Sequence, residues 1–142
     1  MRGSARRPSS WAMTAALLAL AAVFTLCSGA PRVTCVVDGD TFWLDGEKIR
    51  IADINAPETV QAGRPLEVAK GHRAKLRLTE LLNAGKIELI AADRERDRFG
   101  RPLRTVSTDG RNIGALLIAE ELSELWRGCR SDWCAQEKQA TK

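Results

Sequence analysis

The stretch Val36–Thr59, VVDGDTFWLDGEKIRIADINAPET, carries the strongest structural signal in the chain. Two short runs rich in apolar and β-branched residues, Thr41–Leu44 and Lys48–Ile54, lie on either side of Asp45-Gly46. An Asp-Gly pair between two such runs is typical of a two-residue β-hairpin turn. The proline that follows the second run has no N–H to donate to a neighbouring strand. We therefore expect a hairpin followed by a loop.

The register of this hairpin brings charged residues together. Counting back from the turn places Thr41 opposite Arg50. Residues that face each other on antiparallel strands are neighbours in space. We therefore expect Asp40 and Arg50 to lie side by side, with Glu58 close by on the loop that leaves the second strand.

The rest of the chain continues in short strands and helices. Apolar side chains at helical spacing predict a helix with Ala74, Leu78, Leu81 and Leu82 on one face, and Asn112 can cap a second helix. The predicted elements are strands at 33–37, 41–44, 48–54, 86–91 and 103–107, a charged loop at 93–100, and helices at 66–83 and 112–122. This order indicates an all-β or α+β fold, a small closed barrel of the oligonucleotide/oligosaccharide-binding (OB) kind.

The charged residues suit the hydrolysis of a phosphodiester. That reaction needs a water activated by a base, and positive charge from arginines or a divalent ion on the phosphate oxygens. Glu58 can act as the base, while Arg50 and the later Arg101 can bind the phosphate. Each residue taken alone has an ordinary structural explanation, such as a cap or a surface ion pair. Their joint occurrence in the order DGDT, IRI, PET and DRFGR favours a site.

These linked motifs, Val36–Thr59 and Asp97–Arg101, resemble the thermonuclease (staphylococcal nuclease-like) family over about residues 33–127. The resemblance implies a five-stranded OB-fold barrel with two to three helices, and calcium-dependent cleavage of DNA and RNA. It implies that Asp40 binds Ca²⁺, that Arg50 and Arg101 hold the phosphate, and that Glu58 is the base or orients the water. The neighbouring Arg98 and Phe99 are the expected substrate-binding residues.

The chain departs from the family pattern at two positions. Asn55 stands where a second calcium-binding aspartate is usual, and Phe99 stands where a tyrosine is common. Asparagine keeps a carbonyl oxygen but lacks the charge, which is worth about 4 kcal/mol at about 4 Å in an effective dielectric near 20, before desolvation. We therefore expect weak calcium binding, with the backbone oxygen of Ala56 as a further ligand.

The N-terminus has the pattern of a secretory signal peptide. Three arginines within Met1–Arg7 precede the apolar run Trp11–Leu26, and small residues follow at 28–30. The run is shorter than the roughly 20 residues of a membrane span, although an N-terminal membrane anchor is the alternative. We expect a leader or anchor at 1–30, a nuclease-like domain at 31–128 and a tail at 129–142. The protein would be secreted or periplasmic, or tethered to the membrane through residues 11–26.

Four cysteines fit an oxidising compartment. If Cys27 leaves with the leader, Cys129 and Cys134 are close enough in sequence to pair, or Cys35 could tie the start of the domain to the tail. A zinc site is the weaker alternative, because the C-x4-C spacing has no nearby histidine. Of the tryptophans, we expect Trp43 and Trp126 to fill or cover the core rather than to stack on bases.

Charge excludes one class of function. The chain has 22 basic and 18 acidic residues, and three of the basic ones lie within residues 1–30. Without that segment 19 basic residues remain against 18 acidic ones, so a strongly basic domain that coats nucleic acid is excluded. We expect a monomer that acts on DNA or RNA without an obligate protein partner. The alternative is a module that binds nucleic acid or another polyanion and has lost efficient catalysis through Asn55.

Overall fold

The computed structural model describes residues 22–59 and 65–128 of the chain. In chain order the elements are β1 (Thr25–Leu26), β2 (Cys35–Asp38), β3 (Thr41–Leu44), β4 (Glu47–Ile51), β5 (Ile54–Asn55), α1 (Pro65–Asn83), β6 (Ile87–Arg96), β7 (Pro102–Thr108), β8 (Arg111–Asn112), α2 (Ile113–Ala119) and β9 (Glu124–Leu125). Five of these strands are longer than two residues, and each overlaps one of the five predicted strands. The other four strands of the described part have two residues each.

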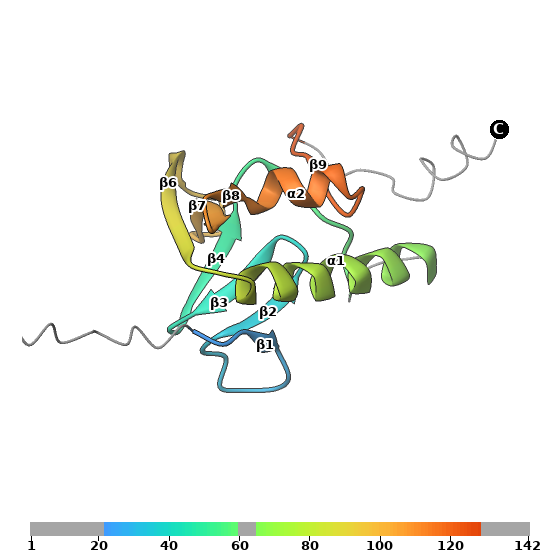
Figure 1. Cartoon of the computed structure of the whole chain (residues 1–142), viewed down its shortest axis with the longest axis horizontal. Coiled ribbons are helices and arrows are strands. Elements are labelled where there is room, and N and C mark those ends of the chain that lie inside the picture. Colours follow the sequence, from blue (N-terminus) through green and yellow to red (C-terminus); the bar gives the residue numbers. More distant parts are fainter. Residues whose placement is uncertain (1–21, 60–64, 129–142) are drawn as a thin grey trace, which may run out of the picture.

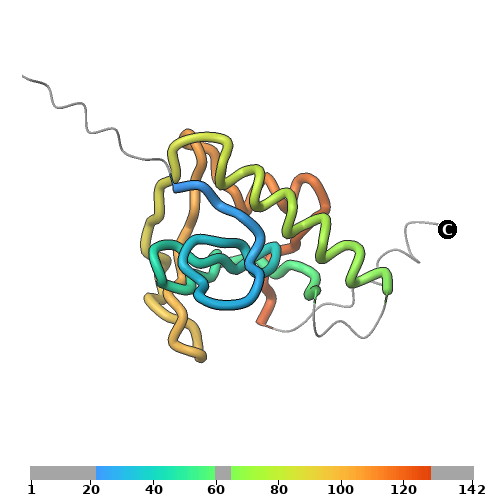
Figure 2. Tube along the Cα trace, turned by 90° about the horizontal axis from the view of Figure 1, so that it is seen from below, coloured from blue at the N-terminus to red at the C-terminus, as the bar shows by residue number. Residues whose placement is uncertain are grey.

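The strands form a mixed, curled sheet with two helices, which is an α+β fold (Figure 1). Their order is β1-β2-β3-β4-β7-β6, with β8 beside β7, and β5 pairs with β9 in a separate two-stranded sheet. β4 and β7 run parallel, so the chain must cross over between them through α1 and β6. α1 packs against β2 and α2, and Figure 2 shows it running along one side of the molecule.

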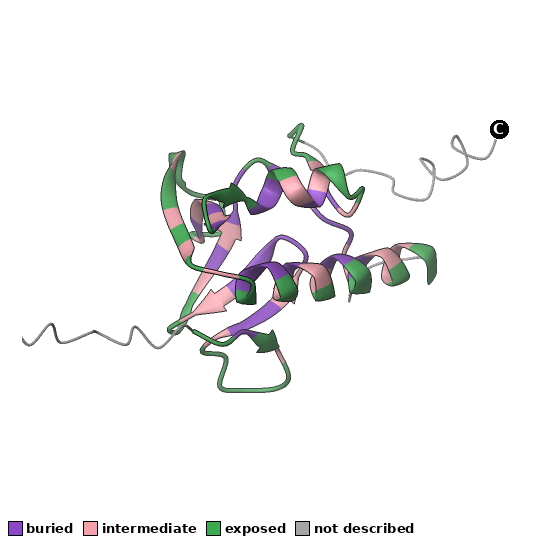
Figure 3. Ribbon diagram, viewed as in Figure 1, coloured by how far each residue is buried: buried purple, intermediate pink, exposed green. Residues whose placement is uncertain are grey.

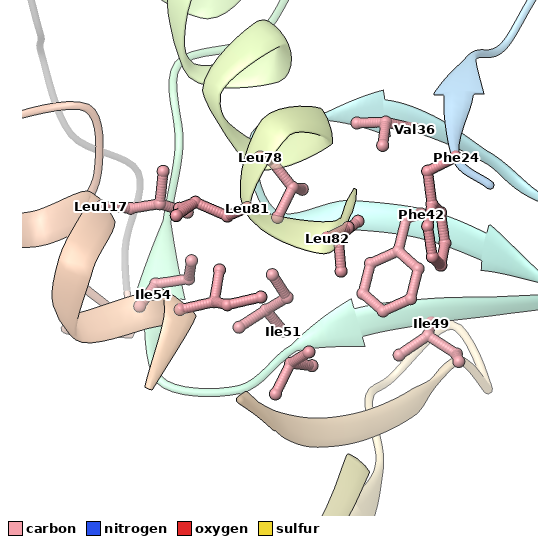
Figure 4. Packing of buried hydrophobic residues seen from close by; sticks show 12 residues of the cluster. Phe24, Val36, Phe42, Ile49, Ile51, Ile54, Leu78, Leu81, Leu82 and Leu117 are labelled. Carbon is pink, nitrogen blue, oxygen red and sulfur yellow. The ribbon is translucent and has the colours of Figure 1, made fainter. Parts of the chain in front are cut away.

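The core lies between α1, α2 and the concave sheet. In Figure 3 the buried residues line the inner faces of the strands and one face of α1, while the opposite face of α1 is exposed. The buried face of α1 includes Ala74, Leu78, Leu81 and Leu82, as the helical spacing predicts. In Figure 4 the leucines of α1 meet Phe42 and Ile51 from the sheet. The helix is therefore held by its apolar face rather than by intrinsic propensity.

The central hairpin has the predicted register. Thr41 faces Arg50, and the two positions next to the turn also face each other. Asp45 and Gly46 have φ angles of 49° and 83°, the left-handed pair that a type I′ turn requires.

The predicted strand 48–54 is wrong at its end. β4 stops at Ile51, and Asp53 adopts a positive φ of 65°, which aspartate tolerates better than most residues. The resulting turn breaks the alternation of side chains, so Ile54 is buried with 3% exposure and Asp53 is exposed. The chain then continues as β5, which pairs with β9 near the C-terminal end of the domain.

The predicted charged loop at 93–100 is also wrong in its first half. β6 extends to Arg96 and pairs with β7, with an irregularity between Ala91 and Arg96. Polar residues are tolerated there because this part of β6 is exposed on both faces. Only Asp97–Gly100 forms the turn, and its backbone is closed by hydrogen bonds between Asp97 and Arg101 and between Gly100 and Asp97.

α2 begins at the predicted cap and ends earlier than predicted. The side chain of Asn112 accepts a hydrogen bond from the backbone N–H of Ala115, as an N-cap does. The helix stops at Ala119 instead of about residue 122, because Glu121 adopts a left-handed φ of 60°.

The folded unit begins before residue 31. Phe24 is 2% exposed and packs edge-on against Phe42, with ring centroids 5.7 Å apart. β1 pairs with β2 in parallel, and Cys27 forms a disulfide with Cys35. The proposed disulfide between Cys35 and the tail is therefore wrong, and a division at residue 30 cuts through the folded unit.

Several sequence predictions fall on residues outside the described part. These are most of the apolar run at 11–26, the cysteines at 129 and 134, and the tail at 129–142. Within residues 22–59 and 65–128, no helix is long and apolar enough to cross a membrane.

Candidate active site

A cavity of about 980 Å³ lies over β4, the β4–β5 turn and the turn between β6 and β7. It collects side chains that the sequence places in four separate motifs. All eight of the predicted site residues line it: Asp40, Arg50, Asn55, Ala56, Glu58, Arg98, Phe99 and Arg101. The hairpin, the loop after β5 and the 97–101 turn therefore face one hollow.

Asp40 is the most constrained of these residues. Its Oδ1 accepts a hydrogen bond of 2.8 Å from the Thr41 hydroxyl, and its Oδ2 accepts one of 3.0 Å from the Ala56 N–H. Arg50 Nη1 lies 2.9 Å from the same Oδ2. The side chains of Asp40 and Arg50 are only 12% and 14% exposed, so this ion pair is poorly screened by water.

Arg50 is oriented by its surroundings. Its Nη2 donates a 3.1 Å hydrogen bond to the backbone oxygen of Ile54, which the β4–β5 turn places there. Nη1 is buried and its contact with Asp40 lacks hydrogen-bond geometry, so among the described residues this nitrogen has an ion-pair partner but no hydrogen-bond acceptor. A buried donor without an acceptor is costly, and an anionic oxygen in the cavity would satisfy it.

The loop that carries Glu58 is packed closely against α1. A Cβ on Gly71 of α1 would lie 2.8 Å from the backbone oxygen of Glu58, and a Cβ on Gly39 would lie 2.8 Å from the Cβ of Ala56. Two glycines thus allow the helix and the DGD segment to approach this loop. Asp38 accepts a 2.8 Å hydrogen bond from Thr59, which ties the end of the loop to the strand before the hairpin.

Asn55 lies at the junction between the cavity and the C-terminal part of the domain. Its backbone oxygen accepts a 2.9 Å hydrogen bond from the hydroxyl of Ser123, and it pairs with Glu124 across the β5–β9 ladder. The described residues contain no group of three or more His, Cys, Asp or Glu side chains that could hold a metal ion. The predicted calcium ligands are not such a group, because only Asp40 supplies a carboxylate, whereas Asn55 supplies an amide oxygen and Ala56 a backbone oxygen.

Asp97 fixes the turn that presents the second arginine. Its two oxygens accept hydrogen bonds from the backbone N–H groups of Phe99 and Arg101 at 2.9 Å and from Arg101 Nε at 2.6 Å. Burial raises the pKa of Asp97, but the hydrogen bonds and the charge of Arg101 outweigh burial and bring this pKa below its ordinary value. The carboxylate is therefore ionised whenever the protein is folded near neutral pH.

Aromatic rings flank both arginines. The Phe99 ring lies 5.4 Å from the guanidinium carbon of Arg101 and 4.7 Å from that of Arg98, and Phe99 is 67% exposed. Trp126 lines the cavity, lies 5.9 Å from the guanidinium carbon of Arg50 and is 49% exposed. Trp126 therefore does not fill the core, which was one of the two expected places for it. Its place depends on β9, a two-residue strand whose partner is not evident from its own sequence.

The chain was compared with known proteins. A family model described as "Staphylococcal nuclease homologue" matches residues 48–141. This chain belongs to that family. The match covers three of the segments that line the cavity, namely the second half of the hairpin, the Glu58 loop and the 97–101 turn, while Asp40 lies before the matched region.

The relatives of this nuclease-family chain carry nuclease names. "Micrococcal nuclease" of Shigella flexneri is 31% identical over 133 residues, which cover 80% of this chain and 71% of that protein. "Endonuclease YncB" and "SPbeta prophage-derived endonuclease YokF", both of Bacillus subtilis, are 34% identical over 95 residues. That region is 63% of this chain but 44% and 31% of the two Bacillus proteins. A nuclease-like function is therefore supported.

Proposed function

We propose that this protein is a secreted or periplasmic nuclease that hydrolyses phosphodiester bonds of DNA or RNA with the help of a calcium ion. The observation that supports this most directly is that Asp40, Arg50, Glu58 and Arg101 all line one cavity. Two guanidinium groups and two carboxylates around one hollow are what phosphoryl hydrolysis needs.

Arg50 and Arg101 bind the phosphate in this proposal. Arg50 is prepared for an anion, because its buried Nη1 has no hydrogen-bond acceptor among the described residues. Arg101 is held by Asp97 through Nε, which fixes the direction in which its guanidinium points. Forked donors held in place stabilise the charge that develops on the phosphate oxygens as the bond breaks.

Glu58 takes the proton of the attacking water. The water oxygen forms a new bond to phosphorus, its proton passes to the Glu58 carboxylate, and the bond from phosphorus to the leaving nucleotide oxygen breaks. That oxygen then takes a proton from solvent. Glu58 suits the task because its loop is fixed between α1 and Asp40, while its side chain lines the cavity.

Asp40, the amide oxygen of Asn55 and the backbone oxygen of Ala56 would hold the calcium ion. Oxygen donors are the ligands that Ca²⁺ prefers, and all three residues line the same cavity, so the donor set fits a calcium ion. When bound, the ion supplies positive charge to the phosphate. Only one of the three donors is charged, and Arg50 already lies 2.9 Å from it, so we expect weak binding.

Arg98, Phe99 and Trp126 line the cavity, with Phe99 and Trp126 exposed, and can contact the rest of the nucleotide. Exposed aromatic rings stack on bases without strong sequence preference, at about 1–3 kcal/mol per base. The protein would thus bind a single-stranded or locally open substrate. We also propose that it acts as a monomer.

The test is digestion of single-stranded DNA and of RNA by the full-length purified protein with millimolar Ca²⁺, with and without EDTA. Fragments that appear with Ca²⁺ and vanish with EDTA support the proposal. Calcium binding should be measured separately by calorimetry, since the ion can bind without cleavage.

One observation favours a second function. Asn55 removes a charge from the metal ligands, which would suit a protein that binds nucleic acid or another polyanion without cutting it. In that case the DNA stays intact in the digestion assay and shifts on a native gel with an affinity that falls steeply with salt.

A further inference from the structure

The N-terminal residues of the described part contribute to the fold in three ways. Phe24 fills the core beside Phe42. The backbone N–H and C=O of Phe24 bond the side chain of Asn83, at the end of α1, with distances of 2.8 and 2.9 Å. Cys27, in turn, is linked to Cys35 at the start of β2.

These contacts decide how the apolar N-terminal run must be divided. The run Trp11–Leu26 is continuous in sequence, but its last residues belong to the folded domain. What remains, Trp11–Ala21, has eleven residues. A membrane span needs roughly 20 apolar residues, whereas the apolar part of a secretory signal has about 7–15. The apolar residues that remain outside the domain are therefore too few for a membrane anchor.

A removable leader also needs small residues one and three positions before the cut. Two places offer them: Ala19 and Ala21, before the domain, and Ser28 and Ala30, within it. A leader that ends at residue 30 would take Phe24 out of the core, leave the side chain of Asn83 without its two backbone partners, and put Cys27 on a different chain from Cys35. A cut after Ala21 removes none of these contacts.

We propose that this chain is processed by hydrolysis of the peptide bond between Ala21 and Ala22. Water supplies the hydroxyl of the new Ala21 carboxylate and a proton for the new Ala22 amine. The residues after the bond are accessible, since Ala22 is exposed and Val23 is 73% exposed. The mature protein keeps the segment 22–30, which packs Phe24 into the core and is linked to β2 by the disulfide. Cys27 is thereby excluded as a lipid-bearing N-terminal residue, because its sulfur is bonded to Cys35.

The experiment is secretion of the full-length chain from a bacterial host, followed by N-terminal sequencing and intact mass of the exported protein. We expect an N-terminus at Ala22. Peptide mapping without reductant should then recover Cys27 and Cys35 in one linked peptide. A chain that keeps Met1, or one that starts at any other residue, overturns the proposal. So does a Cys35 that is free or linked elsewhere.

Two matched variants sharpen the result. Ala21→Phe places a bulky side chain next to the proposed bond and should make the unprocessed precursor accumulate. Ala30→Phe makes the same change at the second small-residue pattern and should leave processing at Ala22 as in the wild type. The reverse pattern overturns the proposal. The inference rests on the proposed export of the protein but not on its proposed nuclease activity. The mass measurement therefore gives the same result whether or not the protein cuts nucleic acid.

Discussion

Arg50 shows how single residues prepare this site. It faces Thr41 across the hairpin, contacts Asp40 at 2.9 Å and bonds the Ile54 backbone at 3.1 Å. The first two contacts follow from counting residues back from the Asp45-Gly46 turn, so they were predictable from the sequence. The contact with Ile54 was not, because it depends on the left-handed Asp53 that ends β4.

Replacing the proposed base should remove activity without unfolding the protein. Glu58→Gln keeps the size of the side chain and loses its ability to take a proton, so kcat should fall by about 10²–10⁴-fold. Glu88→Gln makes the same change on the exposed surface of β6 and serves as a control. Digestion kinetics and thermal unfolding of both variants test this. A Glu58→Gln variant that cuts at the wild-type rate would assign the base elsewhere.

Restoring the charge at residue 55 should strengthen calcium binding. Asn55→Asp adds a carboxylate beside Asp40 in the cavity, and each 1.4 kcal/mol of gained interaction is about a tenfold change in affinity. We expect at least that change in a calorimetric titration with Ca²⁺ alone. Unchanged affinity would mean that the side chain of residue 55 does not contact the ion.

At the scale of elements, the site depends on how closely α1 approaches the Glu58 loop. A side chain at Gly71 would lie 2.8 Å from the Glu58 backbone oxygen and 3.0 Å from that of Pro57. Gly71→Ala should therefore displace the loop and lower kcat by about 10²-fold, the cost that a misplacement of about 1 Å can carry. Arg73→Ala, on an exposed position of the same helix, should leave kcat unchanged.

Thermal unfolding of Gly71→Ala distinguishes the two possible effects of the substitution. Alanine favours a helix over glycine by up to about 1 kcal/mol when nothing obstructs it. A more stable variant with full activity would show that the contact with the loop does not fix Glu58.

The turn at 97–101 should lose stability in acid. The pKa of Asp97 is lower in the folded chain than its ordinary value of 3.8, so its stabilising effect is complete above 3.8 and is lost as the pH falls through the folded value. Asp97→Asn should be less stable than the wild type at neutral pH, and the gap should close below about pH 3.8. Urea unfolding across pH 2–7 measures this, with Asp93→Asn as an exposed control. A gap that stays constant with pH would remove the role given to the carboxylate.

Elements with a local signal were predicted well, and elements set by distant partners were not. The hairpin, the apolar face of α1 and the Asn112 cap are each determined by residues that are close together in the sequence. β5 and β9 have two residues each and exist only because they pair across the chain. The outer half of β6 is highly charged and is a strand because β7 lies beside it. Tertiary context overrides local preference in such places.

For the whole molecule, the same limit explains the N-terminal error. The run Trp11–Leu26 is mostly apolar, and the small-residue pattern inside it, at Ala19 and Ala21, competes with a second one at Ser28 and Ala30, so the sequence alone does not choose where a leader would end. Its contacts with Phe42 and with Asn83, which is 59 residues further along, show that Phe24 belongs to the domain.

Removing the Phe24 ring should destabilise the whole domain. Phenylalanine to alanine in a core costs about 3–5 kcal/mol, and each kcal/mol shifts Tm by about 4–8 °C in a domain of 60–100 residues. Phe24→Ala should therefore lower Tm by more than about 10 °C. Val23→Ala changes an exposed neighbour and should shift Tm little. Equal shifts for both variants would show that the segment is not part of the core.

The bond between Phe24 and Asn83 also sets an order of events during biogenesis. Phe24 is synthesised early, but its partner Asn83 lies at the end of α1, and β7, the parallel partner of β4, is synthesised later still. Over half of the polypeptide must therefore be synthesised before Asn83 can bond Phe24, although the partners of this segment in β2 are made earlier. In the export that we propose, the domain cannot close before α1 and β7 have been synthesised, so the chain can pass unfolded through a translocation channel until that point.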